Sequence, residues 1–296
     1  MTTPNTIAEY LQQLRAALTG ADPAMIQDAL FDAEEHLRSE LAEHPEQTEA
    51  AMLARVAGSY GSPEEIAEIY RDTEIKVQRA LRPPRPQAPR GALARFFGVI
   101  ADARTYGALF YMLLALATGI FYFTWTVTGL GLSAGLAILI VGIPFIILFF
   151  ASVRLLALVE GRLVEVMLGV RMPRRPAASA RELPLLKRIG AMFTDPRTWG
   201  TLLYLLLMLP LGIAYFTVAV TGLAVSLGLV AVPVLQQFGI APVTIDNMQY
   251  FWHGWQLLCS MVGGVLLFFV VLHLARGVGW LHGHLAKHLL VKLGGY

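Results

Sequence analysis

The sequence has little charge and almost no cysteine. Of its 296 residues, only 15% are charged and 56% are hydrophobic, a composition that is rare in soluble domains and typical of chains that have lipid as a solvent. Cys259 is the only cysteine, which excludes a disulfide framework and a thiolate metal site within the chain. These shortages favour an integral membrane protein.

The charge that is present is unevenly distributed. Residues 1–78 contain 15 acidic and 5 basic residues, and residues 79–296 contain the remaining 6 and 18, so the net charges are −10 and +12. The basic residues of the second part stand in short clusters beside apolar runs, as juxtamembrane charges do. We therefore expect no direct binding of nucleic acid. The acidic start of the chain lacks the basic and apolar regions of a cleaved signal peptide.

A long stretch without any ionisable residue predicts the first two membrane spans. Residues 105–153 contain no Asp, Glu, Lys, Arg or His, which makes 49 residues. One helix of that length would reach about 74 Å, far beyond the roughly 30 Å of a bilayer core. The stretch must fold back once, and the glycines and small polar residues of 128–133 predict a tight turn there. We place the spans at about 107–128 and 133–155.

A second pair of spans is predicted at about 200–221 and 255–275. Between them, Gly222–Leu235 offers only 14 apolar residues, too few to cross a membrane. We interpret this stretch as re-entrant or interfacial, and an extra span stays an open alternative. An outer insert over 231–252 completes the connection.

Lysine and arginine flank these spans on one side only. They are frequent at 79–104, at 154–197 and after the last span, whereas the two opposite loops contain neither. Because Lys and Arg near span ends are retained in the cytoplasm, we expect both termini to be cytoplasmic.

The membrane part contains an internal repeat. The pattern Asp-x-Arg-Thr-aromatic-Gly of 102–107 recurs at 195–200, an offset of 93, and Gly161 and Leu163 recur as Gly283 and Leu285, an offset of 122. Amphipathic segments at 93–100 and 185–193 begin the two copies and predict elbow helices in the headgroup layer. The predicted interfacial anchors, by capping and aromatic-belt preferences, are Asp102, Arg104, Tyr106, Asp195, Arg197 and Trp199.

The acidic N-terminal part predicts four short helices. Asp22-Pro23 is a helix start, and Ser62-Pro63-Glu64-Glu65 combines a capping box with proline in the first turn. The predicted fold class is all-α: a small soluble four-helix domain and a polytopic bundle of four spans, built from two repeated hairpins with elbow helices. The predicted parts are an acidic domain (1–82), a Pro/Arg-rich spacer that holds it off the membrane (83–92), repeat 1 (93–175), a cytoplasmic linker (176–184) and repeat 2 (185–296).

The acidic domain resembles the HAAS signalling domain of bacteria, through Tyr10–Leu14, 32–37 and 58–67. The repeated part resembles the sensor domain found ahead of actinobacterial histidine kinases, through 195–199 and 215–223. HAAS domains occur in membrane proteins often encoded beside PadR-like transcriptional regulators. The resemblance therefore implies a bacterial plasma membrane and a PadR-like regulator as partner. No kinase catalytic domain is present in the sequence, so we expect the signal to leave through the HAAS-like domain or a separate partner.

Candidate site residues fall into three groups. Partner-binding candidates on an amphipathic helix face are Glu34, Glu35 and His36. Weak candidates for metal binding are His282, His284 and His288. No carboxylate accompanies them, so we interpret them as residues at the cytoplasmic interface. Ligand-sensing candidates in the polar, aromatic outer insert are Asp246, Tyr250 and Trp252. We expect no cofactor.

These features favour a non-enzymatic membrane sensor or regulator whose cytoplasmic helical domain binds a protein. Its expected partners are membrane lipids and a cytoplasmic regulatory protein, with self-association as a further option. A transporter or permease subunit that acts as an oligomer is the main alternative, since repeats are common in such proteins.

The predicted topology has a direct test. A reporter that is active only outside the cytoplasm, fused after Tyr296, should stay silent because the positive-inside rule places that end in the cytoplasm. Activity of the fusion in intact cells would overturn the orientation.

Overall fold

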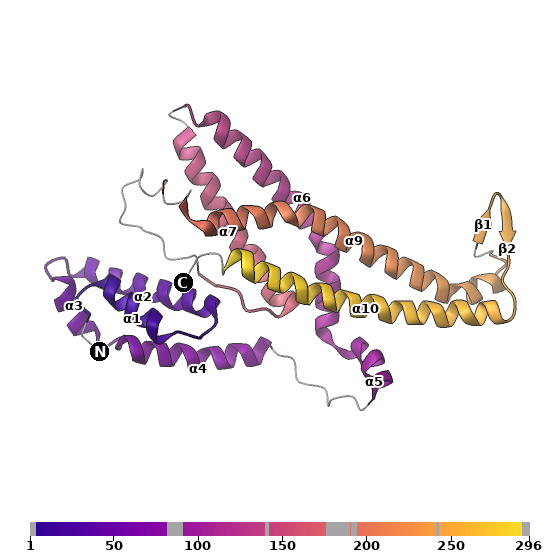
Figure 1. The fold of residues 1–296 in the computed structure, drawn as a ribbon, viewed down its shortest axis with the longest axis horizontal. Helices are drawn as coiled ribbons and strands as arrows, with labels where there is room; N and C mark the ends of the chain where they lie inside the picture. The colour runs from indigo at the N-terminus through magenta and orange to yellow at the C-terminus, as the bar shows by residue number, and fades with distance from the viewer. Residues whose placement is uncertain are drawn as a thin grey trace. The chain divides into compact units, whose positions relative to one another are not determined.

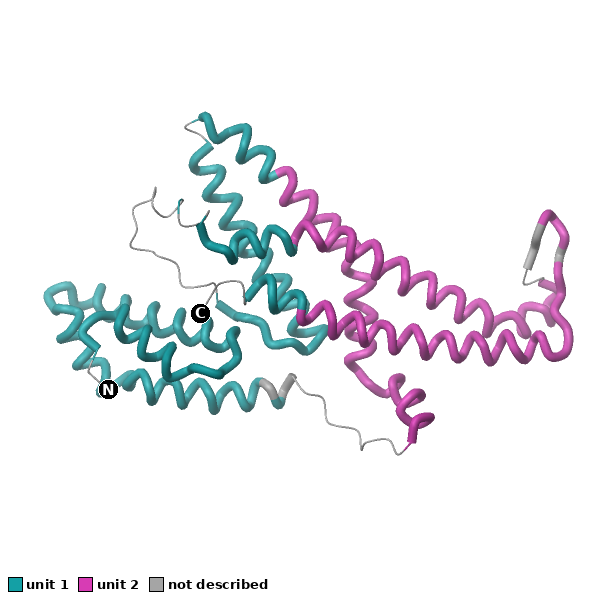
Figure 2. The backbone as a smooth tube through the Cα atoms, in the orientation of Figure 1, with its two compact units in different colours: residues 1–83, 129–204, 285–296 teal, residues 84–128, 205–284 magenta. Residues whose placement is uncertain are grey.

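The computed structural model describes residues 4–81, 91–139, 142–175, 190, 194–240 and 243–291. Its described elements are helices and one short β-hairpin. The chain divides into two compact units, one of residues 1–83, 129–204 and 285–296 and the other of residues 84–128 and 205–284 (Figure 2). Each unit therefore combines segments that lie far apart in the sequence.

Four helices form the N-terminal domain, as predicted (Figure 1). They are α1 (Ile7–Ala17), α2 (Pro23–Glu43), α3 (Glu49–Val56) and α4 (Pro63–Leu81). The Asp22 side chain caps α2 by accepting from the Ala24 amide at 2.9 Å. The capping box is also confirmed: the Glu65 amide donates to Ser62 Oγ at 3.3 Å, and the Ser62 amide donates to Glu65 Oε2 at 2.8 Å.

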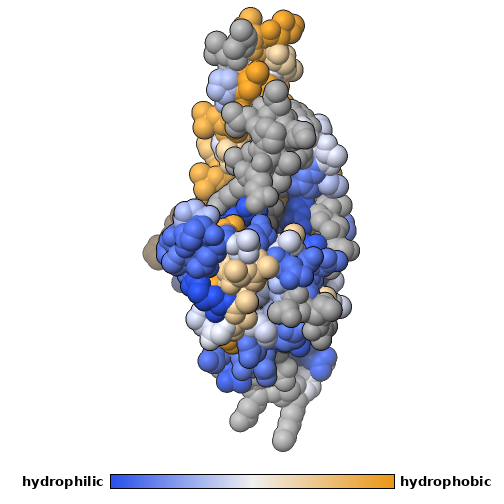
Figure 3. Space-filling view, turned by 90° about the vertical axis from the view of Figure 1, so that its left-hand side faces the viewer, coloured by the Kyte–Doolittle hydropathy of each residue, from blue (hydrophilic) through white to orange (hydrophobic). Residues whose placement is uncertain are grey.

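All four helices contribute to one apolar core. Its fully buried members include Leu14, Leu37 and Met52, and burial of each such side chain is worth about 1.5–3 kcal/mol. The Tyr10 hydroxyl donates to the Gly61 carbonyl at 2.9 Å and thereby links α1 to the start of α4. The lower part of the face shown in Figure 3 is mostly hydrophilic, whereas hydrophobic residues gather in its upper part.

Four further helices are long and apolar enough to cross a membrane. They are α6 (Ala103–Leu136), α7 (Gly142–Leu168), α9 (Pro196–Gln237) and α10 (Trp255–Leu290). The prediction of four candidate spans is confirmed, but each helix is longer than the span predicted for it.

Two predicted interruptions of these helices are wrong. The tight turn expected at 128–133 is part of α6, which continues to Leu136, and the stretch Gly222–Leu235 continues α9 instead of forming a re-entrant piece. In lipid no water replaces a lost backbone hydrogen bond. Glycine and proline are therefore tolerated inside such helices. Residues that indicate a turn in a soluble protein do not indicate one here.

A β-hairpin in the outer insert was not predicted. Strands β1 (Val243–Ile245) and β2 (Met248–Tyr250) pair antiparallel, and Asp246 and Asn247 both have positive φ, at 50° and 61°. Two residues of positive φ define a type I′ turn, and Asp and Asn are among the residues that tolerate it. The Asp-Asn pair between alternating β-prone residues was the signal for this hairpin.

Helix α5 (Ala92–Phe97) and the 3-10 helix η1 (Gly98–Ala101) precede α6, at the position predicted for the first elbow helix. The Phe96 ring lies 5.6 Å from that of Phe269, and His273 Nε2 lies 3.0 Å from the Phe96 carbonyl oxygen. Leu93 remains 75% exposed. Nearly all of the second predicted elbow helix (185–193), the linker 176–184 and most of the spacer 83–92 lie outside the described residues.

Helices α6 and α9 cross at backbone distance in the second unit. A Cβ atom on Gly119 would lie 2.4 Å from the Met208 carbonyl oxygen, and one on Gly212 would lie 2.2 Å from the Ala115 carbonyl oxygen. The two contacts are made by equivalent residues of the repeat. Gly212 follows Gly119 by 93 residues, and Met208 follows Ala115 by 93. The contact is thus reciprocal, and only glycine fits on either side.

The crossing predicts a contrast between two glycine substitutions in α6. Gly119→Ala should destabilise the protein by about 1–3 kcal/mol, because the added methyl group overpacks a backbone contact. Gly131→Ala should leave stability unchanged or raised, because a Cβ there meets nothing within 4 Å. Thermal unfolding of the two purified variants in detergent measures the difference, and equal melting temperatures would contradict the close crossing.

Candidate functional site

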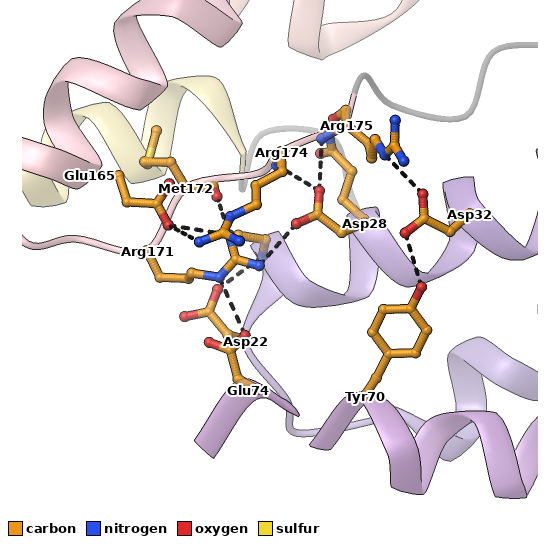
Figure 4. A network of polar contacts seen from close by, with 12 residues as sticks. Asp22, Asp28, Asp32, Tyr70, Glu74, Glu165, Arg171, Met172, Arg174 and Arg175 are labelled. Carbon is orange, nitrogen blue, oxygen red and sulfur yellow. Dashed lines mark hydrogen bonds and ion pairs between the residues drawn. The ribbon is translucent and has the colours of Figure 1, made fainter. Parts of the chain in front are cut away.

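A short segment without regular secondary structure, 169–175, follows α7 and contacts the N-terminal helices within the first unit (Figure 4). Gly169 ends α7 with a φ of 70° while its amide still donates to the Glu165 carbonyl at 3.1 Å. This left-handed conformation favours glycine at a helix end. Pro173 then keeps the preceding residue out of the helical region. The local sequence therefore ends α7 and prevents the chain from continuing as a helix.

Arg171 is the centre of the site. Its guanidinium group lies 2.9 Å from Asp28 Oδ2, 3.3 Å from Glu74 Oε2 and 3.4 Å from Glu165 Oε1. Its Nη1 atom also donates to the Met172 carbonyl at 2.6 Å. The three carboxylates come from α2, α4 and α7, so one cation joins three helices.

The Arg171 network is buried. Arg171 is 8% exposed, and each of its carboxylate partners is less exposed than that. Burial alone would lower the pKa of Arg171, but Asp28, Glu74 and Glu165 raise it above its usual value. Burial raises the pKa of Asp28, although the main-chain donors and Arg171 oppose that shift. We conclude that Arg171 is always charged and needs its acidic partners.

The main chain of the segment is held as well as its side chains. The amides of Arg174 and Arg175 both donate to Asp28 Oδ1, at 2.6 and 2.8 Å. Gln27 Nε2 donates to the Arg175 carbonyl at 2.7 Å. Asp28 therefore accepts from two backbone amides with one oxygen and binds a guanidinium group with the other.

Further ion pairs surround this centre. Arg175 Nε lies 2.9 Å from Asp32 Oδ1, and the Tyr70 hydroxyl donates to Asp32 Oδ2 at 3.0 Å. Lys287, near the end of α10, pairs with Asp22. Burial, followed by Asp32, raises the pKa of Tyr70, so its hydroxyl stays protonated as a donor. These contacts join the N-terminal domain to the segment that follows α7 and to the end of α10. The expected role of the spacer stays a prediction.

This arrangement joins elements that lie far apart in the chain. Every charged side chain named in it has an oppositely charged partner, and a buried ion pair loses its stabilisation when one partner moves away. A displacement of α7 or of the end of α10 would therefore change the ion pairs of α2 and α4 directly.

The three partner-binding candidates do not form one surface. Glu34 is buried and pairs with Arg38 at 2.8 Å, whereas Glu35 is exposed. The His36 ring stacks on Tyr60 with centroids 4.2 Å apart. Their role in partner binding stays a prediction, and it now depends chiefly on Glu35.

The three histidine candidates are not brought together around one point. His282 is fully buried, with Nε2 2.6 Å from the Tyr111 hydroxyl and Nδ1 3.3 Å from that of Tyr215. His284 Nδ1 lies 2.7 Å from the Trp280 carbonyl oxygen, and His288 follows one turn later on α10. Within the part of the chain that the structure describes, no group of three His, Cys, Asp or Glu residues could hold a metal. His282 is therefore a packed residue of the helical part, held between two tyrosines, and the interface interpretation of the three histidines stays a prediction.

The first unit contains another buried hydrogen bond from a tyrosine hydroxyl to an ionisable side chain. The Tyr204 hydroxyl donates to Glu160 Oε1 at 2.9 Å, and both side chains are fully buried. Tyr204 follows Tyr111 by 93 residues, and His282 follows Glu160 by 122, the two offsets of the predicted repeat. Sequence reasoning missed Glu160 and the pairing of His282, although the offsets alone could have aligned these residues.

Two of the predicted anchors, Asp102 and Asp195, act as helix caps. The Arg104 amide donates to Asp102 Oδ1 at 3.1 Å, and the Arg197 amide donates to Asp195 Oδ1 at 2.9 Å. Both predicted caps are confirmed. Asp102 also pairs with Arg276 at 3.2 Å.

The two aromatic anchors are exposed, and one of them has a main-chain partner. Tyr106 is 45% and Trp199 54% exposed, and the Tyr106 hydroxyl donates to the Ile100 carbonyl at 2.8 Å. Such exposure suits a membrane interface. Their location in that interface stays a prediction.

The ligand-sensing candidates gather on the hairpin and its exit. Asp246 lies in the turn, and Tyr250 ends β2 with 46% of its surface exposed. The main chain of Trp252 is fixed by Gln236, whose Nε2 donates to its carbonyl at 2.7 Å and whose Oε1 accepts from its amide at 2.9 Å. The hairpin is thus tied to the end of α9 while its tip is free to contact other molecules.

Two family models together match most of the chain. A family model described as "Putative sensor" matches residues 111–290, and the HAAS model matches residues 9–69. No curated protein and no solved structure matches the chain. The Arg171 network joins carboxylates at or beside the HAAS match to a segment inside the sensor match.

Removal of the central cation tests the network. Arg171→Gln should weaken docking of the segment by about 3–5 kcal/mol, because it leaves buried carboxylates without their counter-charge. Arg55→Gln is the matched control, since Arg55 pairs with Glu40 at 2.9 Å on the surface and such pairs contribute about 0–1 kcal/mol. Hydrogen exchange of residues 165–175 in the full chain measures docking. Equal protection in the two variants would show that the network is not what holds the segment.

Proposed function

The chain belongs to the Sensor family, and from this premise we propose that it is a membrane sensor that passes its signal to a protein partner through its HAAS domain. Four candidate membrane spans and a separate acidic helical domain support this division of labour. The spans receive the stimulus, and the HAAS domain presents the output.

The observation that carries this proposal is the Arg171 network. Its carboxylates belong to α2 and α4 of the N-terminal domain and to α7 of the membrane part, at distances of 2.9–3.4 Å from one guanidinium group. A side-chain contact of about 3.6 Å is no longer a hydrogen bond. A shift of α7 by one or two ångströms, as in known helix movements, would therefore loosen the contact and alter the HAAS domain.

We propose a non-enzymatic role. The buried ionisable groups of the network are held in multiple ion pairs, which favours structural coupling over proton transfer or nucleophilic attack. The predicted sensing element is the outer insert, where Asp246 and Tyr250 are exposed on the hairpin and Trp252 follows it.

The proposed location is a bacterial plasma membrane, with both termini in the cytoplasm. The clusters of Lys and Arg beside α6, α7 and α10 support this topology. Membrane lipids are proposed partners through the elbow helix, and self-association is a further option. The proposed protein partner is a regulatory protein, for which a PadR-like transcriptional regulator is the first choice, and the chain itself does not bind nucleic acid.

Reciprocal contacts support a duplicated membrane part. Gly129 faces the Phe149 ring in the first unit, and Gly222 faces Val271 in the second. These residues are related by the offsets 93 and 122, as are the two buried tyrosine contacts. We propose that each repeat supplies one hairpin of the same internal packing.

Purification from the native membrane tests the proposed function. We expect a cytoplasmic regulatory protein to accompany the full chain. Arg171→Gln should change its amount severalfold because that substitution uncouples the HAAS domain, whereas Arg55→Gln should leave it unchanged. Mass spectrometry of the bound proteins provides the measurement. Failure to recover any protein, together with substrate flux in liposomes that contain the pure chain, would favour the transporter alternative.

A further inference from the structure

We propose that the acidic groove of the HAAS domain is a docking site for an arginine-bearing extended segment of a partner protein, and that residues 169–175 occupy it as an internal pseudo-ligand. This inference deepens the proposed function, on which it rests, by naming the surface and the chemistry of the partner.

The groove is built to receive positive charge. Its carboxylates stand at the start of α2, along α2 and on α4, and they are Asp22, Asp28, Asp32 and Glu74. Each of them pairs with a cation that comes from outside the N-terminal domain.

The manner in which the segment is held is that of a bound peptide. It has no regular secondary structure, and its backbone is recognised at two amides and one carbonyl by Asp28 and Gln27. Main-chain contacts of this type do not depend on the identity of the side chains. Side-chain selection then falls to Arg171, whose guanidinium group fits the carboxylates of Asp28 and Glu74.

The groove is only partly filled. A cavity of about 380 Å³ remains beside the segment, lined in part by Met25, Thr73 and Val77. The side chains of Arg174 and Arg175 are still 48% and 51% exposed. A competing segment can therefore begin to bind at this open end before the internal segment has left.

The geometry also specifies the ligand. It carries one arginine that becomes buried, followed after two residues by two arginines whose backbone amides reach Asp28, with a residue such as Pro173 keeping the chain extended. Because an internal segment is present at an effective concentration in the millimolar range, it excludes a free competitor of equal affinity. Release of the segment by a movement of α7 would open the site to the partner.

The probe for this site is a fluorescent peptide with the sequence of residues 167–176, added to the full chain in lipid nanodiscs. We expect Arg171→Gln, which weakens the internal occupant, to bind the peptide at least tenfold more tightly than the wild type does. A second substitution, Asp28→Asn, should abolish that gain. A peptide in which the first arginine is replaced by glutamine should not bind.

Two further variants guard against misfolding. Arg174→Gln with Arg175→Gln alters only half-exposed side chains and should also raise peptide affinity, though less than Arg171→Gln does. Hydrogen exchange at Leu14, Leu37 and Met52 reports whether the HAAS core is intact in each protein. If folded variants bind the peptide no better than the wild type, or if Asp28→Asn has no effect, the docking site is refuted. Recovery of a partner protein in that case would leave the proposed function standing and place the partner on another surface.

Discussion

A buried arginine and the carboxylates that it requires hold together the first unit. Arg171 is enclosed by the three carboxylates of Asp28, Glu74 and Glu165, which belong to three different helices. A cation in such a place is tolerable only while its partners remain, since an uncompensated buried charge costs several kcal/mol. This property bears on function. Because the loss of one ion pair leaves buried charges without a partner, we expect the ion pairs of Arg171 to form and break together.

The second constraint is the absence of water in the hydrocarbon core. It keeps α6 and α9 helical through glycines and prolines that would end a helix in a soluble protein. The glycines then acquire a different use: Gly119 and Gly212 bring two helix backbones into contact. Several buried polar groups within the long helices contact one another, as with Tyr204 and Glu160, or with His282 between Tyr111 and Tyr215.

The caps and the helices of the N-terminal domain could be predicted because they are local. Ser62 and Glu65, or Asp102 and the amide of Arg104, lie within one helical turn of each other, so the sequence alone brings them into contact. The number of candidate spans followed from apolar length for the same reason. The helix boundaries near 128–136 and 222–237 could not be predicted in this way, because propensities from water do not apply in lipid. The hairpin at 243–250 was accessible from Asp246 and Asn247, whose turn preference was overlooked.

The sequence by itself determined that this protein has a small acidic helical domain and four apolar helices with charge at one side, because composition, periodicity and capping act over a few residues. Only the tertiary structure decided what surrounds Arg171. Asp28 lies 143 residues away from it in the chain, and nothing in the local pattern distinguished this arginine from the other bases that follow α7. It likewise placed Glu34 inside the domain and His282 between two tyrosines, because burial depends on which distant helices pack against a residue.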